Sequence, residues 1–195
     1  MKRRVLTTAL WVSGLLSASA QKKPGDITIS QHGKEYILSD NNDLTLEAKP
    51  FSIRFLVKPY TDQERNGVQI AALGRRDNLE LAAIGKQIDQ IPYFAEGTSL
   101  ASEQDGYSSI FLDDEANHYI YYTSDSDKRA KVLEQKNGLL LLEWSPHSFY
   151  LNASDGDTEF AVAGVHSFFL VFLNDVNHNN IIDPGELHKV AIHLK

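Results

Sequence analysis

The sequence predicts an all-β protein folded as a single antiparallel β-sandwich. Short segments of alternating apolar and polar residues recur along the chain, and clusters of Gly, Asn and Asp separate them. Turn signals about ten residues apart favour a sandwich or barrel over βαβ units. A closed β-barrel is the alternative that the same pattern allows. The chain of 195 residues has the size of one domain, and neither a repeat nor a linker divides it.

The N-terminus has the three-part pattern of a secretory signal. Basic residues follow Met1, an apolar stretch covers 5–16, and Ala18-Ser19-Ala20 supplies small residues at a cleavage site. The apolar stretch is shorter than the roughly 20 residues that a membrane span needs. We therefore expect a signal peptide over 1–20 and one secreted or periplasmic β domain over 21–195, with no membrane insertion after cleavage.

Composition excludes several classes of protein. The chain has no cysteine, which rules out a disulfide scaffold, a thiolate metal site and a cysteine nucleophile. It has 19 Lys and Arg against 26 Asp and Glu, a net charge of −7, and loss of the signal makes that charge three units more negative. Because phosphate contacts need clustered cations, nucleic acid is not an expected partner. The acidic balance favours solubility or basic partners.

Strands are predicted from alternation and apolar runs. Phe51, Ile53, Phe55 and Val57 place four apolar side chains on one face of an extended segment. Residues 165–173 give the strongest strand signal because nearly all of them are apolar. The expected strands cover 27–29, 36–38, 44–46, 51–57, 68–73, 107–112, 118–123, 139–144, 149–151, 160–162, 165–173 and 187–194.

Two segments also allow a short helix. Residues 78–88 mix helical and strand periods, and residues 127–136 carry Ala130, Val132 and Leu133 among charges. Asn137-Gly138 then either stops a helix or turns a β-hairpin. The sequence leaves both readings of that segment open.

The segment 175–186 carries the clearest chemical pattern. With Asp175 as position 1 of a twelve-residue loop, oxygen-bearing side chains fall at positions 1, 3, 5, 9 and 12, and position 7 offers a backbone carbonyl. Calcium takes six to eight oxygens, so alternate residues of a tight loop must point inward. Apolar Ile182 at position 8 suits a loop anchored to a core. The candidate ligands are Asp175, Asn177, Asn179, Ile181, Asp183 and Glu186.

This pattern resembles the calcium loop of EF-hands and dockerin modules, with two departures. Asn180 stands where glycine is usual, and Asn is the non-glycine residue that best tolerates the left-handed conformation. The flanks, 168–173 and 190–194, read as strands rather than helices. The nearer resemblance is to strand-flanked loops in secreted bacterial β-sandwich modules such as adhesin repeats. It covers about 20 residues and implies a structural calcium ion, but no family for the whole chain.

A polar hairpin rich in Asn and Asp, which favour turns without a metal, is the alternative for this segment. If calcium binds, it fixes the last hairpin. The few formal negative charges imply moderate affinity, suited to millimolar extracellular calcium.

Other candidates have simpler structural explanations. Residues 113–118 combine three acids and a histidine, and Asp125 and Asp127 lie in a similar stretch, but both are typical of charged surface turns. Tyrosines at 119, 121 and 122 either stack on sugars or pack half-buried in a strand. Trp144 ends an apolar run and is expected in the core. The seven histidines form no HExxH pair, and neither a G-x-S-x-G elbow nor a phosphate loop occurs.

The leading functional hypothesis is a secreted, non-catalytic β-sandwich that is stabilised by one calcium ion and binds a polysaccharide or protein partner. A small secreted hydrolase, with a site assembled from distant carboxylates and histidines, is a second hypothesis, and a structural envelope component is a third. The sequence names neither the partner nor the process.

Overall fold

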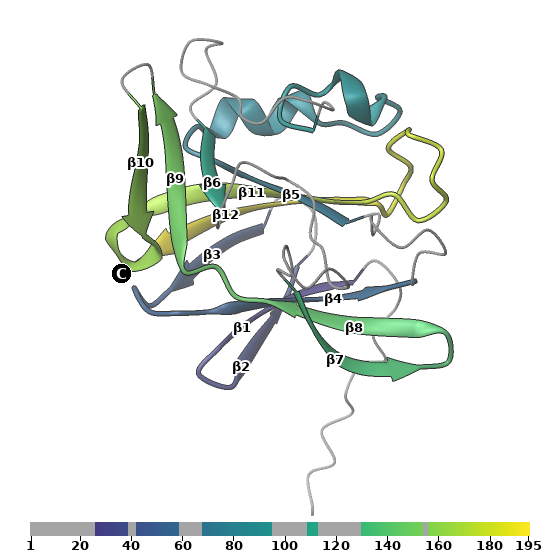
Figure 1. Ribbon diagram of the computed structural model, residues 1–195, viewed down its shortest axis with the longest axis horizontal. Helices are drawn as coiled ribbons and strands as arrows, with labels where there is room; N and C mark the ends of the chain where they lie inside the picture. Colours follow the sequence, from purple (N-terminus) through teal and green to yellow (C-terminus); the bar gives the residue numbers. More distant parts are fainter. Residues whose placement is uncertain (1–25, 39–41, 59–67, 95–108, 113–129, 154–155) are drawn as a thin grey trace, which may run out of the picture.

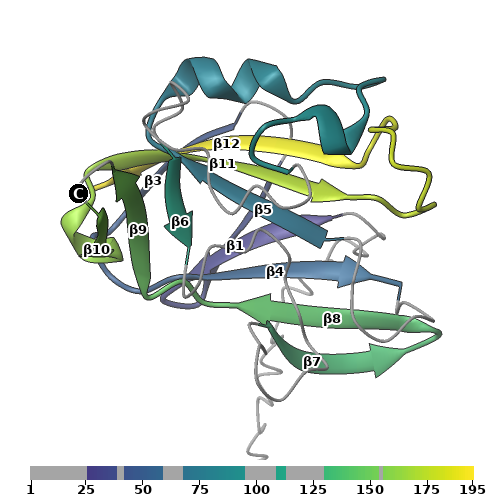
Figure 2. The same ribbon diagram turned by 45° about the horizontal axis from the view of Figure 1, so that its top comes forward.

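The computed structural model describes residues 26–38, 42–58, 68–94, 109–112, 130–153 and 156–195. In this part of the chain two β-sheets pack face to face (Figures 1 and 2). The predicted β-sandwich is confirmed, and the sheets stay separate rather than closing into a barrel. The predicted signal peptide lies outside the described residues. None of the helices in the described ranges is long and apolar enough to cross a membrane.

A five-stranded sheet forms one layer, in the order β2-β1-β4-β8-β7. All of its pairings are antiparallel. Its strands are β1 (Ile27–Gln31), β2 (Lys34–Ile37), β4 (Ser52–Val57), β7 (Ala130–Lys136) and β8 (Leu139–Trp144).

A seven-stranded sheet forms the other layer, in the order β10-β9-β6-β5-β11-β12-β3. Its pairings are antiparallel except that β3 lies parallel to β12. This one parallel pair departs from the antiparallel prediction, and local alternation could not show it because β3 and β12 lie at opposite ends of the chain. The strands are β3 (Asn42–Leu46), β5 (Val68–Leu73), β6 (Ser109–Leu112), β9 (Ser148–Ala153), β10 (Gly156–Ala161), β11 (Ser167–Asn174) and β12 (Leu187–Leu194).

Two hairpins turn on left-handed residue pairs. His32 and Gly33 have φ of 50° and 77°, and Asn137 and Gly138 have φ of 53° and 73°. Two positive φ values in a two-residue loop match the twist of the flanking strands. The Asn-Gly pair therefore makes a hairpin between β7 and β8, and the helix considered for 127–136 is wrong for its described part.

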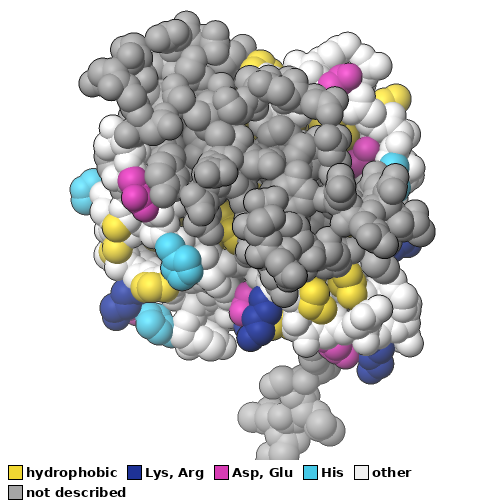
Figure 3. Space-filling view, in the orientation of Figure 1, with side chains coloured by type: hydrophobic (Ala, Val, Ile, Leu, Met, Phe, Trp, Pro, Cys, Tyr) yellow, Lys and Arg dark blue, Asp and Glu magenta, His cyan; other side chains and the backbone are white. Residues whose placement is uncertain are grey.

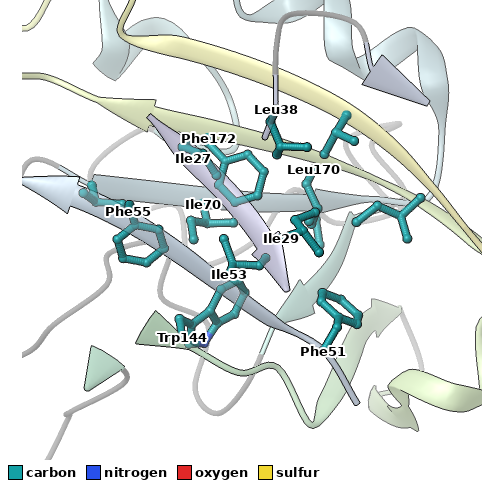
Figure 4. Close-up of a cluster of buried hydrophobic side chains, with 14 of the residues drawn as sticks. Ile27, Ile29, Leu38, Phe51, Ile53, Phe55, Ile70, Trp144, Leu170 and Phe172 are labelled. Carbon is teal, nitrogen blue, oxygen red and sulfur yellow. The ribbon is translucent and has the colours of Figure 1, made fainter. Parts of the chain in front are cut away.

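The inner faces of the two sheets form the main core. Phe55, Ile53 and Trp144 from the five-stranded sheet face Leu170 and Phe172 from β11 (Figure 4). Trp144 is buried as expected, with 1 % of its surface exposed. Strand alternation thus directs one side of each sheet into a common apolar layer.

A third layer covers the outer face of the seven-stranded sheet. Residues 74–94, which we call the strap, include the 3₁₀ helices η1 (Arg76–Leu81) and η2 (Ile88–Gln90). The helix considered for 78–88 is therefore only a short 3₁₀ segment followed by a turn. Figure 2 shows the strap lying across β5 and β11. A second apolar cluster fills this contact: Ala71, Leu73, Leu79, Ala82, Ile88, Ile91, Tyr93, Phe94, Val171, Leu173, Ile182 and Leu187.

The outer surface of the five-stranded sheet carries ion pairs beside exposed apolar side chains such as Ile37. The Nε of Arg54 lies 2.7 Å from Oε2 of Glu143, and its Nη1 lies 2.8 Å from Oε1 of Glu35. The first ion pair joins β4 to its neighbour β8, and the second reaches across β1 to β2. On the face shown in Figure 3, acidic, basic and apolar side chains of the described residues are interspersed.

Gln31 holds the chain where it crosses from β3 to β4. Its side-chain Nε2 donates to the carbonyls of Glu47 and Lys49 at 3.0 Å each, and its Oε1 accepts from the Glu47 amide at 2.9 Å. Gln31 is buried, so one amide side chain satisfies three backbone groups at the link between the sheets.

Replacing Gln31 with Ala is expected to lower the free energy of unfolding by roughly 2–4 kcal/mol, because three backbone groups lose their partner. Gln135→Ala, on exposed β7, is the matched control and should change stability by less than about 0.5 kcal/mol. Urea unfolding monitored by Trp144 fluorescence measures both. Equal midpoints for the two variants would contradict the role assigned to Gln31.

Candidate metal centre

The loop 175–186 joins β11 to β12 and folds beside the strap (Figures 1 and 2). At its base the amide of Asn174 donates to the carbonyl of Glu186 at 2.9 Å. This bond continues the ladder between β11 and β12 by one step. The first and last candidate ligands, Asp175 and Glu186, are therefore brought together by the sheet itself.

Asp175 is buried, with 9 % of its surface exposed, and its carboxylate binds the loop backbone. Oδ1 accepts from the amide of Asn179 at 3.2 Å, and Oδ2 accepts from the amide of Asn180 at 3.1 Å. Hydrogen bonds from N–H groups to a carboxylate are stronger than bonds between neutral groups. The carboxylate of Asp175 thus holds the first half of the loop in a tight turn.

Glu186 does the same for the second half. It is 5 % exposed, its Oε1 accepts from the amide of Val176 at 2.9 Å, and its Oε2 accepts from the amide of Asp183 at 2.9 Å. A carboxylate has about four acceptor positions, and these bonds use one on each oxygen. Both buried carboxylates therefore keep acceptor capacity beyond the backbone bonds that place them.

The other three side-chain candidates meet at one atom. Oδ2 of Asp183 accepts from Nδ2 of Asn177 at 2.7 Å and from Nδ2 of Asn179 at 2.9 Å. The amide oxygens of the two asparagines point the other way, toward the backbone amides of Asn179 and Ile181 at 3.1 and 2.8 Å. Positions 3, 5 and 9 of the loop thus meet, with nitrogen of the two asparagines facing Asp183 in place of the oxygen that a calcium ligand needs.

Three left-handed residues allow this tight path. His178, Asn180 and Gly185 have φ of 59°, 61° and 92°. The left-handed conformation expected of Asn180, at the position where glycine is usual, is confirmed. An ordinary side chain would be strained there.

Ile181 offers its carbonyl to the loop rather than to the strap. The carbonyls on either side of it face the strap: Asn180 O accepts from the amide of Ile88 at 3.0 Å, and Ile182 O accepts from that of Gly85 at 2.8 Å. In an extended segment successive residues direct their backbone groups to opposite sides. The Ile181 amide accordingly bonds to Asn179 Oδ1 on the loop side, and the Ile181 carbonyl shares that side.

The donor set fits calcium in kind. It combines three carboxylates, two amide side chains and one backbone carbonyl, all of which offer the oxygen ligands that calcium prefers. One rearrangement is required, because Asn177 and Asn179 present nitrogen toward Asp183. To bind an ion together with Asp183, each amide must rotate and release one backbone N–H. Losing such bonds costs about 1 kcal/mol each, which limits affinity.

The remaining sequence candidates do not form a second site in the described structure. Among the described residues, no group of three or more His, Asp and Glu side chains is close enough to hold a metal. This holds for the loop 175–186 too, where asparagine and backbone oxygens make up half of the candidate ligands. The acidic stretch 113–118, Asp125, Asp127 and the tyrosines at 119, 121 and 122 lie outside the described residues.

Comparison with known proteins assigns no family. No family model, no curated protein and no solved structure matches the chain.

The strap residues that contact the loop were not foreseen from the sequence. Gly85, Lys86 and Ile88 bind it through backbone hydrogen bonds, which give no signal in the sequence, and the Ile88 side chain packs in the same apolar cluster as Ile182. Gly85, with φ of 86°, marks a turn, but a single glycine does not reveal what the turn contacts. Ile182 was expected to anchor the loop in a core, and it is fully buried in the strap cluster.

Isosteric amide substitutions should separate the roles of the two ends of the loop from that of Asp183. Glu186→Gln puts an NH₂ group against a backbone N–H, so we expect a loss of about 1–3 kcal/mol of stability even in EDTA. Asp183→Asn keeps an acceptor oxygen for Asn177 and Asn179 and should change stability in EDTA by less than about 1 kcal/mol. Denaturant unfolding in EDTA tests both. A neutral Glu186→Gln would show that its backbone bonds do not shape the loop.

Proposed function

We propose that this chain is a secreted, non-catalytic β-sandwich that is stabilised by one calcium ion and binds a polysaccharide or protein partner outside the cytoplasm. The observation that carries the proposal is the loop 175–186, whose two buried end carboxylates, Asp175 and Glu186, are held in place by backbone bonds. Asp175, Asn177, Asn179, Ile181, Asp183 and Glu186 would hold the ion.

Calcium would act here as a cross-link rather than as a reagent. The candidate ligands come from both ends of the β11–β12 connection, so a bound ion would tie the two strand ends and the intervening loop together. The candidate ligands include three carboxylates, and a divalent cation would offset their formal negative charge. Affinity in calcium loops rises with ligand charge and rigidity, and this loop combines a modest charge with two amides that must rotate. Moderate affinity suits extracellular calcium.

A binding role is supported by the architecture of the described chain. A sandwich with a doubly covered seven-stranded sheet is a rigid scaffold, and loops at the ends of such scaffolds commonly carry recognition. The acidic balance of the chain favours a partner with basic groups or a neutral glycan over an anionic surface.

Calcium should raise the melting temperature of residues 21–195. A ligand at 100 times its Kd that binds only the folded state adds about 2.7 kcal/mol, which for a domain of this size shifts Tm by roughly 5–11 °C. Calorimetry in EDTA and in millimolar calcium measures the shift. Asp183→Asn should abolish it, whereas Asp89→Asn, an exposed acid on the strap, should keep it. An unchanged melting temperature for the unaltered chain would remove calcium from the proposal.

Secretion is tested by processing of the full chain. Expressed in a bacterium, the protein is expected in the periplasm or medium with a mass that lacks residues 1–20, starting at Gln21. Ala18→Arg should block cleavage, because the site needs a small residue at that position. Intact mass spectrometry of each cell fraction gives the result. An uncleaved cytoplasmic product from the unaltered chain would contradict the assigned location.

A further inference from the structure

We infer that calcium in the loop holds the strap closed over the seven-stranded sheet, through the peptide group between Ile181 and Ile182. This inference rests on the proposed calcium site and adds a consequence of it: one ion would control the order of residues 74–94. The ligand class is a divalent cation, and the controlled element is the strap with its apolar cluster.

Several backbone hydrogen bonds join the loop to the strap. The amides of Gly85 and Ile88 donate to carbonyls of Ile182 and Asn180 at 2.8 and 3.0 Å, and the amide of Ile182 donates to the carbonyl of Lys86 at 2.9 Å. Gln87 and Ile181 form an isolated antiparallel bridge. The two segments lie about a hundred positions apart in the sequence, yet they pair as a short ladder.

The peptide group that links Ile181 to Ile182 lies between the strap and the proposed ion. Its N–H end bonds to Lys86 on the strap, and a trans peptide directs its C=O end to the opposite side. That carbonyl is the position-7 ligand. An ion bound to the carbonyl would polarise the whole peptide group and strengthen its N–H bond to the strap, because hydrogen bonds in a chain reinforce one another.

The side chain of Ile182 packs the loop into the same apolar cluster as the strap. It is fully buried and shares the second apolar cluster with Ile88, Ile91 and Leu173. If the strap opens, the Ile182 side chain loses apolar neighbours, and its N–H and C=O lose their bonds to Lys86 and Gly85. The Ile181 carbonyl then loses the support that directs it into the loop, so opening of the strap and release of the ion become one event.

Amide hydrogen exchange by NMR, with and without calcium, tests the inference on the chain 21–195. If opening requires release of the ion, calcium at 100 times its Kd should slow exchange at Gly85, Ile88 and Ile182 by about 100-fold. The Leu38 amide, which donates to Ile27 in the other sheet at 2.9 Å, reports opening elsewhere and should change much less. Asp183→Asn should remove the slowing, and Asp89→Asn should retain it.

Three other results would overturn the inference, and they differ in whether the proposed calcium site stands. Protection confined to Val176, Asn179 and Asn180, whose amides bond to the loop carboxylates, would keep the calcium site and overturn its control of the strap. Equal slowing at Leu38 would assign the effect to global stability and would overturn it as well. No calcium binding at all, measured by titration calorimetry, would reject the proposed site and this inference with it.

A second arm uses the reciprocity of linked equilibria. Ile91 is buried in the strap cluster at 1 % exposure, and Ile84 on the same strap is 59 % exposed. Ile91→Ser should open the strap and weaken calcium binding roughly tenfold or more, whereas Ile84→Ser should leave the Kd unchanged. The same Kd for both variants, with the strap amides of Ile91→Ser exchanging freely, would overturn the coupling. If Ile91→Ser fails to fold, the exchange experiment on the unaltered chain still decides.

Discussion

Burial of β11 on both faces is the constraint on which the rest of the structure depends. Phe168, Leu170 and Phe172 face the five-stranded sheet, while Val171 and Leu173 face the strap. A strand with two apolar faces needs a cover on each side. The sandwich supplies one cover and the strap the other, so the three-layer arrangement follows from the composition of one strand.

The position of the loop follows from the same strand. β11 ends at Asn174, where the apolar run stops and the chain must return along β12. Burying Asp175 and Glu186 at this end would be unfavourable without partners, and the loop amides provide them. The two carboxylates therefore serve as folding elements in their own right. The proposed metal-binding role is built on a loop that its own backbone already organises.

The sequence predicted best what is decided locally. Alternation placed Phe51, Ile53, Phe55 and Val57 on one strand face, and each is buried. The Asn137-Gly138 pair allowed two readings because Asn-Gly suits both a helix end and a hairpin, and the pairing of β7 with β8 decides it. Asn177 and Asn179 contact Asp183, and a few residues of sequence were enough to place these three side chains in one loop.

Features decided by distant contacts could not be predicted. The parallel pairing of β3 with β12 depends on Leu44 meeting Ile192, and neither segment alone carries that information. The strap has no regular period because it packs as short 3₁₀ turns, with Leu79, Ile88 and Ile91 reaching the sheet at irregular intervals. Its bonds to the loop use backbone atoms, which every residue has. The sequence therefore predicted which residues meet within the loop, but it did not predict the contacts between the loop and the strap.

Competition for the same oxygens sets the affinity that this loop can reach. Backbone amides already occupy Asn177 Oδ1 and Asn179 Oδ1, so a cation must displace them, whereas the Asp175 and Glu186 oxygens each retain free acceptor capacity. An ion in the proposed site would thus gain two buried carboxylates that the backbone already places, but it would have to rearrange the two exposed asparagines. The first effect lowers the entropy lost on binding, and the second costs hydrogen bonds. In the proposed site these two effects would together set the Kd for calcium, and the contacts of the loop with the strap would extend the effect of a bound ion beyond its ligands.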